Sequence, residues 1–235
     1  MINVNELEKI CKILKRNLKK DAKKAKLDKK EIDRRYYHSI RVARLCLELG
    51  QQDFKKFSLN NKDLEILFIA GLLHDISKFK EKLGKGNHAE IAYNDLPIFL
   101  KFKSEYFIHS IGYIVSKHSD KKNYEFVDIE DEMERANSIR EIDNEYCEKY
   151  YIKNIKRYIM INILKEADIF DHMEMNYVNL TCGNSSVLLD KLISELEEYD
   201  KEKFSRMGKE LYSKGMKYLY FKRRKKNIWK SLLYE

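Results

Sequence analysis

Four stretches of the chain carry an apolar face with the spacing of an α-helix, and each has a histidine or an aspartate at one end. The first runs over residues 38–49, where His38, Val42, Leu45 and Leu49 fall on one face. This register turns His38 toward the apolar side of its helix. An imidazole that leaves water needs a new partner there, because a buried polar group without one costs free energy.

His74 and Asp75 stand side by side directly after the second stretch, the apolar run 67–73. Two groups that prefer water therefore lie next to a segment predicted to be core. A divalent cation satisfies an imidazole and a carboxylate at once. The third stretch ends at His118 and the fourth at Asp168. Four helices that bring such side chains to a common centre predict a metal site in the interior of a helical bundle.

The whole chain is predicted to be helical. Its 235 residues include only 8 glycines and 1 proline, too few for a sheet with many tight turns. Ser58 or Asn60 is positioned to cap the helix that leads to His74. The expected helices cover about residues 3–26, 30–50 and 63–77, a short helix that begins at His88 and stops before Pro97, and one that ends at His118.

Five short segments, taken in order, resemble the HD superfamily of metal-dependent phosphohydrolases. The resemblance covers about residues 31–180 and implies an all-α bundle of the HD-domain type. The matching segments are YHSIRVA at 37–43, AGLLHDISK at 70–78, NHAEIA at 87–92, VSKH at 115–118 and LKEAD at 164–168.

The resemblance also implies a ligand set and a chemistry. One or two divalent transition-metal ions are expected, and imidazole and carboxylate ligands suit Fe, Mn, Zn, Ni or Co. Two ions bridged by Asp75 would supply a metal-activated hydroxide at neutral pH and clamp phosphoryl oxygens. The implied ligands are His38, His74, Asp75 and Asp168 for one ion, with His88 and His118 completing a second.

Two further polar residues are assigned roles beside the metal. Lys78 stands where the family often has a lysine, so it would either neutralise charge on a substrate phosphate or pair with an acid. Asp171, one turn after Asp168, would orient a ligand imidazole or a water next to the substrate. Asp75 and Lys78 are therefore the predicted catalytic residues, and Lys78 and Asp171 the predicted substrate contacts. Gly71 would let a helix or a substrate oxygen approach closely.

The predicted domain organisation is an HD-type domain over residues 1–180 and a basic C-terminal helical extension over 181–235, packed on the same domain. An insertion at about 119–150 would form a lid or hairpin, or a disordered loop. The net charge of +9 is uneven, because residues 214–230 hold eight basic side chains and no acidic one. Such a block favours phosphate-bearing partners, although a lysine-rich chain also solvates its exposed helices in this way.

Several classes of protein are disfavoured by the sequence. No window of 18 apolar residues predicts a membrane span, and residues 1–18 lack a signal-like apolar block. The four cysteines are widely spaced and are expected to be reduced thiols. These features predict a cytoplasmic protein.

His109 falls off the apolar stripe that ends at His118, so it is expected to be a structural or surface histidine.

Three functions are consistent with this sequence. The first is a hydrolase that cleaves a phosphoester or phosphoanhydride bond of a nucleotide, since the 30-residue spacing of His88 and His118 resembles that of the bacterial hydrolases of symmetrical dinucleoside polyphosphates. The second is a single-strand nuclease similar to the HD nucleases of CRISPR systems, with nucleic acid bound by the basic tail. The third is a sensor that binds metal and nucleotide without turnover.

Overall fold

The computed structural model describes residues 3–57, 59–118 and 156–171, together with 193–194, 197, 209–213 and 216. The chain divides into two compact units, residues 1–167 and 168–235. Every regular element among the described residues is a helix. The prediction of an all-α fold is therefore confirmed.

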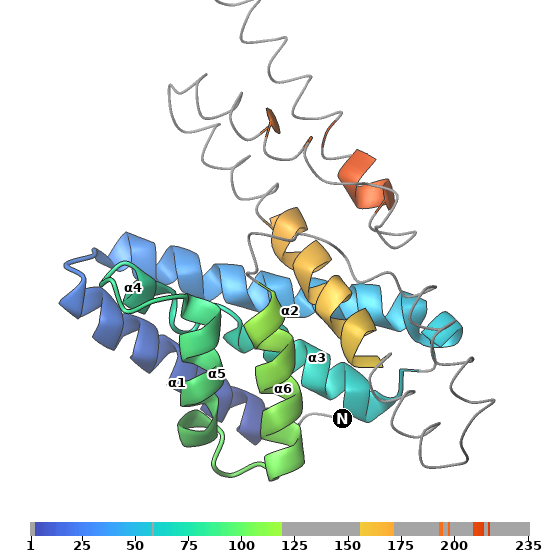
Figure 1. The fold of residues 1–235 in the computed structure, drawn as a ribbon, viewed down its shortest axis with the longest axis horizontal. Helices are drawn as coiled ribbons and strands as arrows, with labels where there is room; N and C mark the ends of the chain where they lie inside the picture. Colours follow the sequence, from blue (N-terminus) through green and yellow to red (C-terminus); the bar gives the residue numbers. More distant parts are fainter. Residues whose placement is uncertain are drawn as a thin grey trace, which may run out of the picture. The chain divides into compact units, whose positions relative to one another are not determined.

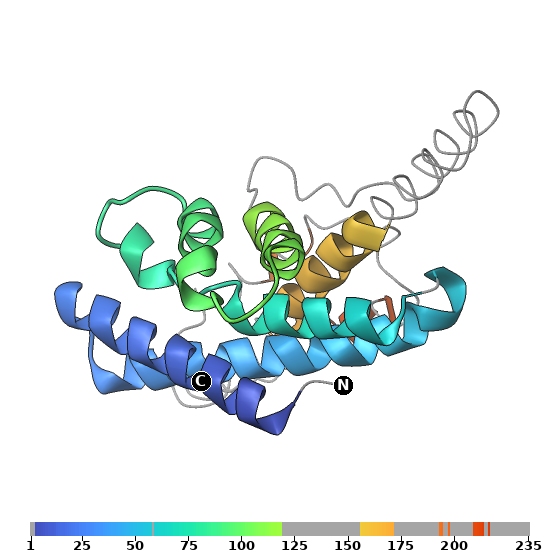
Figure 2. The same ribbon diagram turned by 90° about the horizontal axis from the view of Figure 1, so that it is seen from below.

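The described part of the first unit consists of six labelled helices, α1 to α6, and the first part of the helix at 156–171. Helix α3 lies between α2 and α6, while α1 packs on α2 and α5 packs on α6 (Figure 1). Figure 2 shows α1 and α2 on one side of α3, with α5 and α6 on the other. The labelled helices are α1 (Val4–Lys24), α2 (Lys29–Phe57), α3 (Asn61–Leu73), α4 (Lys78–Glu81), α5 (His88–Phe99) and α6 (Glu105–Lys117).

Side-chain caps fix the start of α3 and α5. Asn60 caps α3, because its side-chain oxygen accepts from the backbone N–H of Asp63 at 3.0 Å. The Asp63 carboxylate accepts in return from the backbone N–H of Asn60 at 2.9 Å, which completes a capping box. Asn87 caps α5 by accepting from the N–H of Ala89 at 2.8 Å. Of the two caps predicted for α3, Asn60 is confirmed, and Ser58 lies outside the described residues.

Several predicted helix boundaries were wrong. Helix α5 continues through Pro97 to Phe99. A proline in the last turn removes only one N–H bond, and the N–H of Leu100 still donates to the carbonyl of Leu96 at 2.8 Å. Helix α2 extends to Phe57 instead of ending near residue 50. Helix α3 ends at Leu73, so residues 74–77 form turns that lead directly into α4.

Helices α2 and α3 approach each other closely at Gly71. A Cβ atom at this position would lie 2.8 Å from the Cα of Ala43 and 3.0 Å from the Sγ of Cys46. The prediction of a close approach at Gly71 is therefore confirmed, and the neighbour is a helix. Cys46 is fully buried in this contact, as a packing thiol.

The first described residues of the helix at 156–171 contact α3 and α6. Lys156 Nζ lies 2.9 Å from the Oδ2 of Asp63, and the guanidinium of Arg157 lies 5.4 Å from the ring centre of Tyr113. Its predicted apolar face is buried, including Ile159, Ile163 and Leu164. The predicted insertion at about 119–150, the boundary at residue 180 and most of the basic tail lie outside the described residues.

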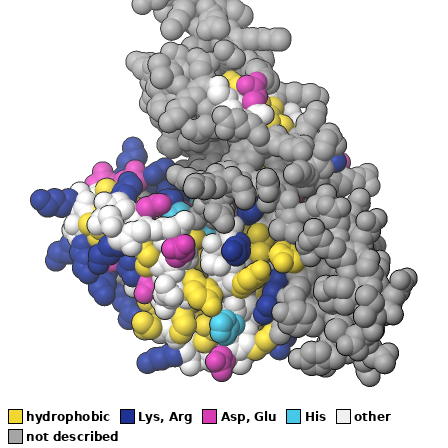
Figure 3. Space-filling model, viewed as in Figure 1, with side chains coloured by type: hydrophobic (Ala, Val, Ile, Leu, Met, Phe, Trp, Pro, Cys, Tyr) yellow, Lys and Arg dark blue, Asp and Glu magenta, His cyan; other side chains and the backbone are white. Residues whose placement is uncertain are grey.

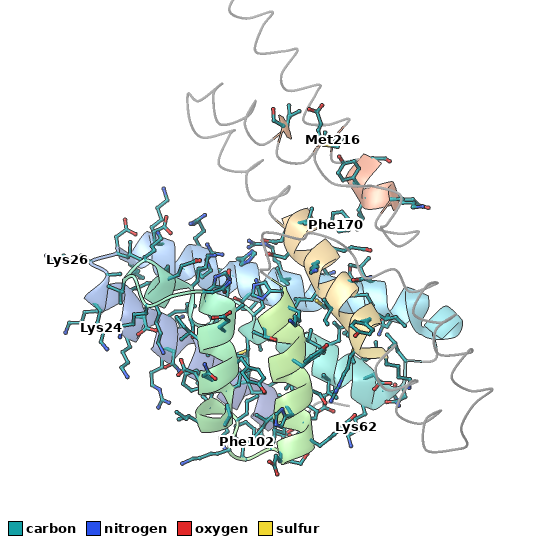
Figure 4. The ribbon with its side chains drawn as sticks, in the orientation of Figure 1. Lys24, Lys26, Lys62, Phe102, Phe170 and Met216 are labelled. Carbon is teal, nitrogen blue, oxygen red and sulfur yellow. The ribbon has the colours of Figure 1, made fainter. Side chains whose placement is uncertain are left out.

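The turn between α1 and α2 presents an exposed basic surface. Space-filling colours show lysines and arginines gathered over this end of the first unit (Figure 3). Lys24 and Lys26 mark its position (Figure 4). The exposed lysines of this surface are Lys23, Lys24, Lys26, Lys29 and Lys30.

Among the described residues, no helix combines the length and apolar character needed to cross a membrane.

Candidate metal centre

Asp75 is almost fully buried, and its two carboxylate oxygens face two different pairs of histidines. Its Oδ2 lies 3.4 Å from the Nε2 of His38 and 3.6 Å from the Nε2 of His74, which we call the first pair. Its Oδ1 lies 3.1 Å from the Nε2 of His88 and 3.9 Å from the Nε2 of His118, the second pair. A single carboxylate is thus shared between two imidazole pairs.

The spacing within each pair fits two ligands of one cation. The Nε2 atoms are 3.1 Å apart in the first pair and 3.2 Å apart in the second. Two imidazole nitrogens that each lie about 2.1 Å from one ion would be separated by about 3 to 3.5 Å. In each pair the two nitrogens and an Asp75 oxygen all lie within 4.8 Å of one another. Both pairs therefore fit a divalent metal in donor type and in spacing.

Two of the four histidines have their ring orientation fixed by the backbone. His74 follows the last residue of α3, and its Nδ1 lies 2.7 Å from the carbonyl of Gly71. His118 follows the last residue of α6 in the same way, with Nδ1 2.6 Å from the carbonyl of Val115. Because a carbonyl oxygen only accepts, Nδ1 carries the proton in both rings. Their Nε2 lone pairs therefore face Asp75.

Arg35 is a member of this cluster that the sequence prediction missed. Its Nη1 donates to the Oδ2 of Asp75, and both side chains are buried. Burial alone would raise the pKa of Asp75, but the positive charge of Arg35 and the neighbouring imidazoles of His74, His38 and His88 outweigh it. The pKa of Asp75 is held well below its ordinary value. The carboxyl is therefore ionised, as a metal ligand must be.

Glu81 is the second residue that the sequence prediction missed. Its Oε2 lies 2.9 Å from the Nζ of Lys78 and 3.1 Å from the Nδ1 of His88. Burial would raise the pKa of Glu81, but its interactions with Lys78 and His88 lower it. Lys78 therefore pairs with an acid, which was one of the two alternatives for this residue. The available signal was the spacing, because residues three apart are neighbours on a helix.

A carboxylate on α5 anchors the segment that carries Lys78 and Glu81. Asp95 accepts from the hydroxyl of Ser77 at 3.3 Å, and the ammonium of Lys80 also donates to its Oδ2. Short α4 is thereby attached to the same helix that begins with His88. The rim of the second pair is consequently built from α4 and α5 together.

The remaining predicted residues lie away from this cluster or in the second unit. His109 is exposed on α6, where its Nδ1 lies 3.5 Å from the hydroxyl of Tyr93, in agreement with its predicted surface position. Asp168 follows Ala167, the last residue of the first unit, within the same helix, and Asp171 is the last residue of that helix that the structure describes. Both aspartates belong to the second unit, and their roles as ligand and substrate contact stay predictions.

Comparison with known proteins identifies one family. The model of the HD domain matches residues 35–173, which is more than half of the chain. The match begins at Arg35 and includes both histidine pairs and Asp75. No curated protein and no solved structure matches the chain.

Proposed function

Because the chain belongs to the HD-domain family, whose members are in general metal-dependent hydrolases, we propose that it cleaves a phosphoester or phosphoanhydride bond of a nucleotide. The observation that carries the proposal is the sharing of Asp75 between two histidine pairs. Two neighbouring cations held by one carboxylate are a frequent solution for phosphoryl transfer to water. A phosphorylated small molecule is therefore the expected substrate.

The proposed ligands divide into two sets that share Asp75. His38 and His74 would hold one ion, with Asp168 as their predicted further ligand. His88 and His118 would hold a second. When bound, such ions supply a Lewis acid for phosphoryl oxygens and lower the pKa of water toward neutrality. The donor atoms suit Fe, Mn, Zn, Ni or Co.

The protein groups contribute charge and position. Arg35 holds the shared carboxylate in place and balances its negative charge within the buried cluster. Lys78 lies at the rim with 25% of its side chain exposed, so its ammonium can turn from Glu81 to a substrate phosphate. It would then neutralise the charge that develops on the phosphate. We assign the catalytic roles to Asp75 and Lys78, and a further substrate contact to Asp171.

Metal analysis followed by a substrate panel tests this function. The panel would contain p-nitrophenyl phosphate esters, diadenosine tetraphosphate, deoxynucleotides and short single-stranded DNA. We expect bound transition metal, hydrolysis of at least one nucleotide, loss of that activity on chelation and its return when metal is restored. Full activity after verified removal of metal would refute the proposal. Bound metal without turnover of any substrate would favour the sensor function.

A nuclease is the second candidate, favoured by the eight basic side chains of residues 214–230. Deletion of residues 221–235 separates the two activities. Each lysine or arginine contact to a single strand contributes about −0.7 to the slope of log affinity against log salt. A nuclease that uses this tail would lose DNA binding and most of that slope. We expect instead that the shortened chain keeps its nucleotide hydrolysis, and loss of DNA cleavage with metal retained would reverse this preference.

A further inference from the structure

We propose that Glu81 selects the tautomer of His88 that can bind metal, and so determines whether the second pair holds its ion. The inference rests on the proposed metal-dependent function, and it adds a positioning residue outside the predicted ligand set. The side chain of Glu81 is 36% exposed and lies on the four-residue helix α4. It contacts His88 on the side of the ring that faces away from Asp75.

Among the described residues, the Nδ1 atom of His88 has two neighbours with opposite requirements. The Oε2 of Glu81, at 3.1 Å, can only accept a hydrogen bond when the carboxyl is ionised. The Nζ of Lys78, at 3.2 Å, can only donate when the amine is protonated. A neutral imidazole carries one proton, so Nδ1 either donates to Glu81 or accepts from Lys78. The choice between these two bonds is the choice between the two tautomers.

The tautomer decides what the opposite nitrogen offers to the cluster. The Nε2 of His88 lies 3.1 Å from the Oδ1 of Asp75 and 3.2 Å from the Nε2 of His118. When Nδ1 donates to Glu81, Nε2 presents a lone pair at this position and is ready to bind metal. When Nδ1 accepts from Lys78, Nε2 carries the proton and donates to Asp75. That proton then occupies the direction in which a cation would bind.

Glu81 favours the first tautomer in two ways. Its Oε2 accepts from His88 and also receives the ammonium of Lys78 at 2.9 Å, so it engages the competing donor. A phosphate that draws Lys78 away would strengthen the same tautomer, because Glu81 would be left with His88 alone. His74 and His118 need no such help, since backbone carbonyls fix their tautomers. The dependence on a side-chain carboxylate therefore concerns His88.

Replacement of Glu81 gives a measurable change in metal binding. In Glu81→Ala, Lys78 is the remaining neighbour of Nδ1, so His88 should change tautomer. We expect the affinity of the second ion to fall by about 10- to 100-fold, the usual effect of removing the hydrogen-bond partner of a ligand. The affinity of the ion at the first pair should not change. Glu90→Ala is the matched control, because Glu90 is exposed on α5 two residues from His88 and does not share its face.

A double variant distinguishes tautomer selection from a structural role. Adding Lys78→Met to Glu81→Ala removes the donor that stabilises the wrong tautomer. Metal affinity at the second pair should then rise above that of Glu81→Ala alone. If Glu81 merely held α4 in place, loss of both charged side chains would leave the site at least as weak as the single change. The affinities are measured by titration of the metal-free proteins with Mn²⁺ and Zn²⁺.

Imidazole ¹⁵N NMR of the metal-free protein, recorded at a pH where the spectrum shows the ring in its neutral form, observes the tautomer directly. We expect His88 to carry its proton on Nδ1 in the unmodified chain and on Nε2 in Glu81→Ala. An unchanged tautomer in Glu81→Ala, or a double variant no better than the single one, would overturn the inference. This measurement needs no metal, so a chain that bound no ion would refute the proposed function while the NMR result still decided the role of Glu81.

Discussion

The two histidine pairs around Asp75 are held by different kinds of contact. The first pair lies on α2 and directly after α3, and Gly71 allows the backbones of these two helices to meet. The second pair lies at the start of α5 and the end of α6. There a Cβ atom at Gly112 would meet the side chain of Tyr93 and no backbone atom of α5, and His88 contacts the partly exposed side chains of Lys78 and Glu81 on α4.

This difference separates a fixed site from an adjustable one. Backbone packing leaves the first pair little freedom, because displacing one ring requires moving a whole helix. At the second pair, one ring is oriented by Lys78 and Glu81, which can rotate at the surface. We therefore expect the fold to set metal affinity at the first pair, and the charged rim to set it at the second.

The largest expected effect is at Asp75, which faces both pairs. In Asp75→Asn the side chain keeps its shape but loses its charge, and its amide N–H groups point toward one of the pairs. Affinity for both ions should fall by more than about 100-fold, because a direct ligand matters more than the partner of a ligand. Turnover should fall to background. Calorimetric metal titration and the substrate panel provide the measurement.

The control for Asp75→Asn is His109→Ala, which removes an exposed imidazole from α6 and should leave metal binding and turnover intact. Retention of full affinity at one pair in Asp75→Asn would show that the carboxylate serves only the other. A large loss of activity in His109→Ala would instead show that α6 presents a different face to the site.

Two glycine substitutions compare the packing behind the pairs. Gly71→Ala places a Cβ atom 2.8 Å from the backbone of Ala43, and overpacking of this kind costs about 1 to 3 kcal/mol. Gly112→Ala places one 2.8 Å from the Cδ2 of Tyr93, a half-buried ring that can turn aside. Alanine also favours a helix over glycine by up to about 1 kcal/mol. Gly112→Ala should therefore be nearly neutral in stability.

Urea unfolding measures the stability of both glycine variants, and metal titration measures their metal affinity at each pair. Gly71→Ala should also weaken binding at the first pair, since it separates the helices that carry His38 and His74. Equal losses of stability in the two variants would mean that Tyr93 is as immobile as a helix backbone. The distinction between a fixed and an adjustable pair would then have no basis in packing.

The helices and the inward histidines could be predicted because hydrophobic periodicity determines which face of a helix is buried. That pattern placed His38, His74 and His118 on buried faces or at their ends, and the structure brings them together around Asp75. The match of the HD family to residues 35–173 agrees with the segments that carried the resemblance. The roles of these residues as ligands stay predictions.

Arg35 and Glu81 were missed because charged side chains on helices usually face solvent. Arg35 lies three residues before His38 and so shares its buried face, but periodicity alone does not identify the carboxylate that it meets 40 residues later. Glu81 contacts His88 across a loop. Both are tertiary contacts, which depend on how α2, α4 and α5 pack around the turns after α3.

The continuation of α5 through Pro97 was also not predicted. The last turn of this helix still closes, because the N–H of Leu100 donates to the carbonyl of Leu96.

The smallest expected effect on the two metal pairs is at Lys103, which joins the loop between α5 and α6 to α1 and α3. Its ammonium donates to Glu6 of α1 at 2.7 Å and to Glu65 of α3 at 3.0 Å. The neighbouring Phe102, marked in Figure 4, lies under the ammonium of Lys9 on α1 at 3.9 Å. These contacts fasten the helices of the second pair to those of the first.

Lys103→Met should lower the free energy of unfolding by about 1 to 2 kcal/mol, because two charge-assisted hydrogen bonds are lost from a largely buried group. Burial would lower the pKa of Lys103, but its bonds to Glu6 and Glu65 outweigh that effect and raise it. Because the pKa of Lys103 is higher in the folded than in the unfolded chain, its stabilisation of the fold is fully present below the unfolded pKa of about 10.4. The difference from the unmodified chain should hold between about pH 7 and 10 and shrink above that range. Urea unfolding at several pH values tests this, and a difference that persisted above the folded pKa would exclude the charge as its source.

Both metal affinities should change by less than about twofold in Lys103→Met, since Lys103 contacts neither pair. A selective loss at the second pair would show that its adjustability comes from the docking of α5 and α6, and not from Glu81 and Lys78.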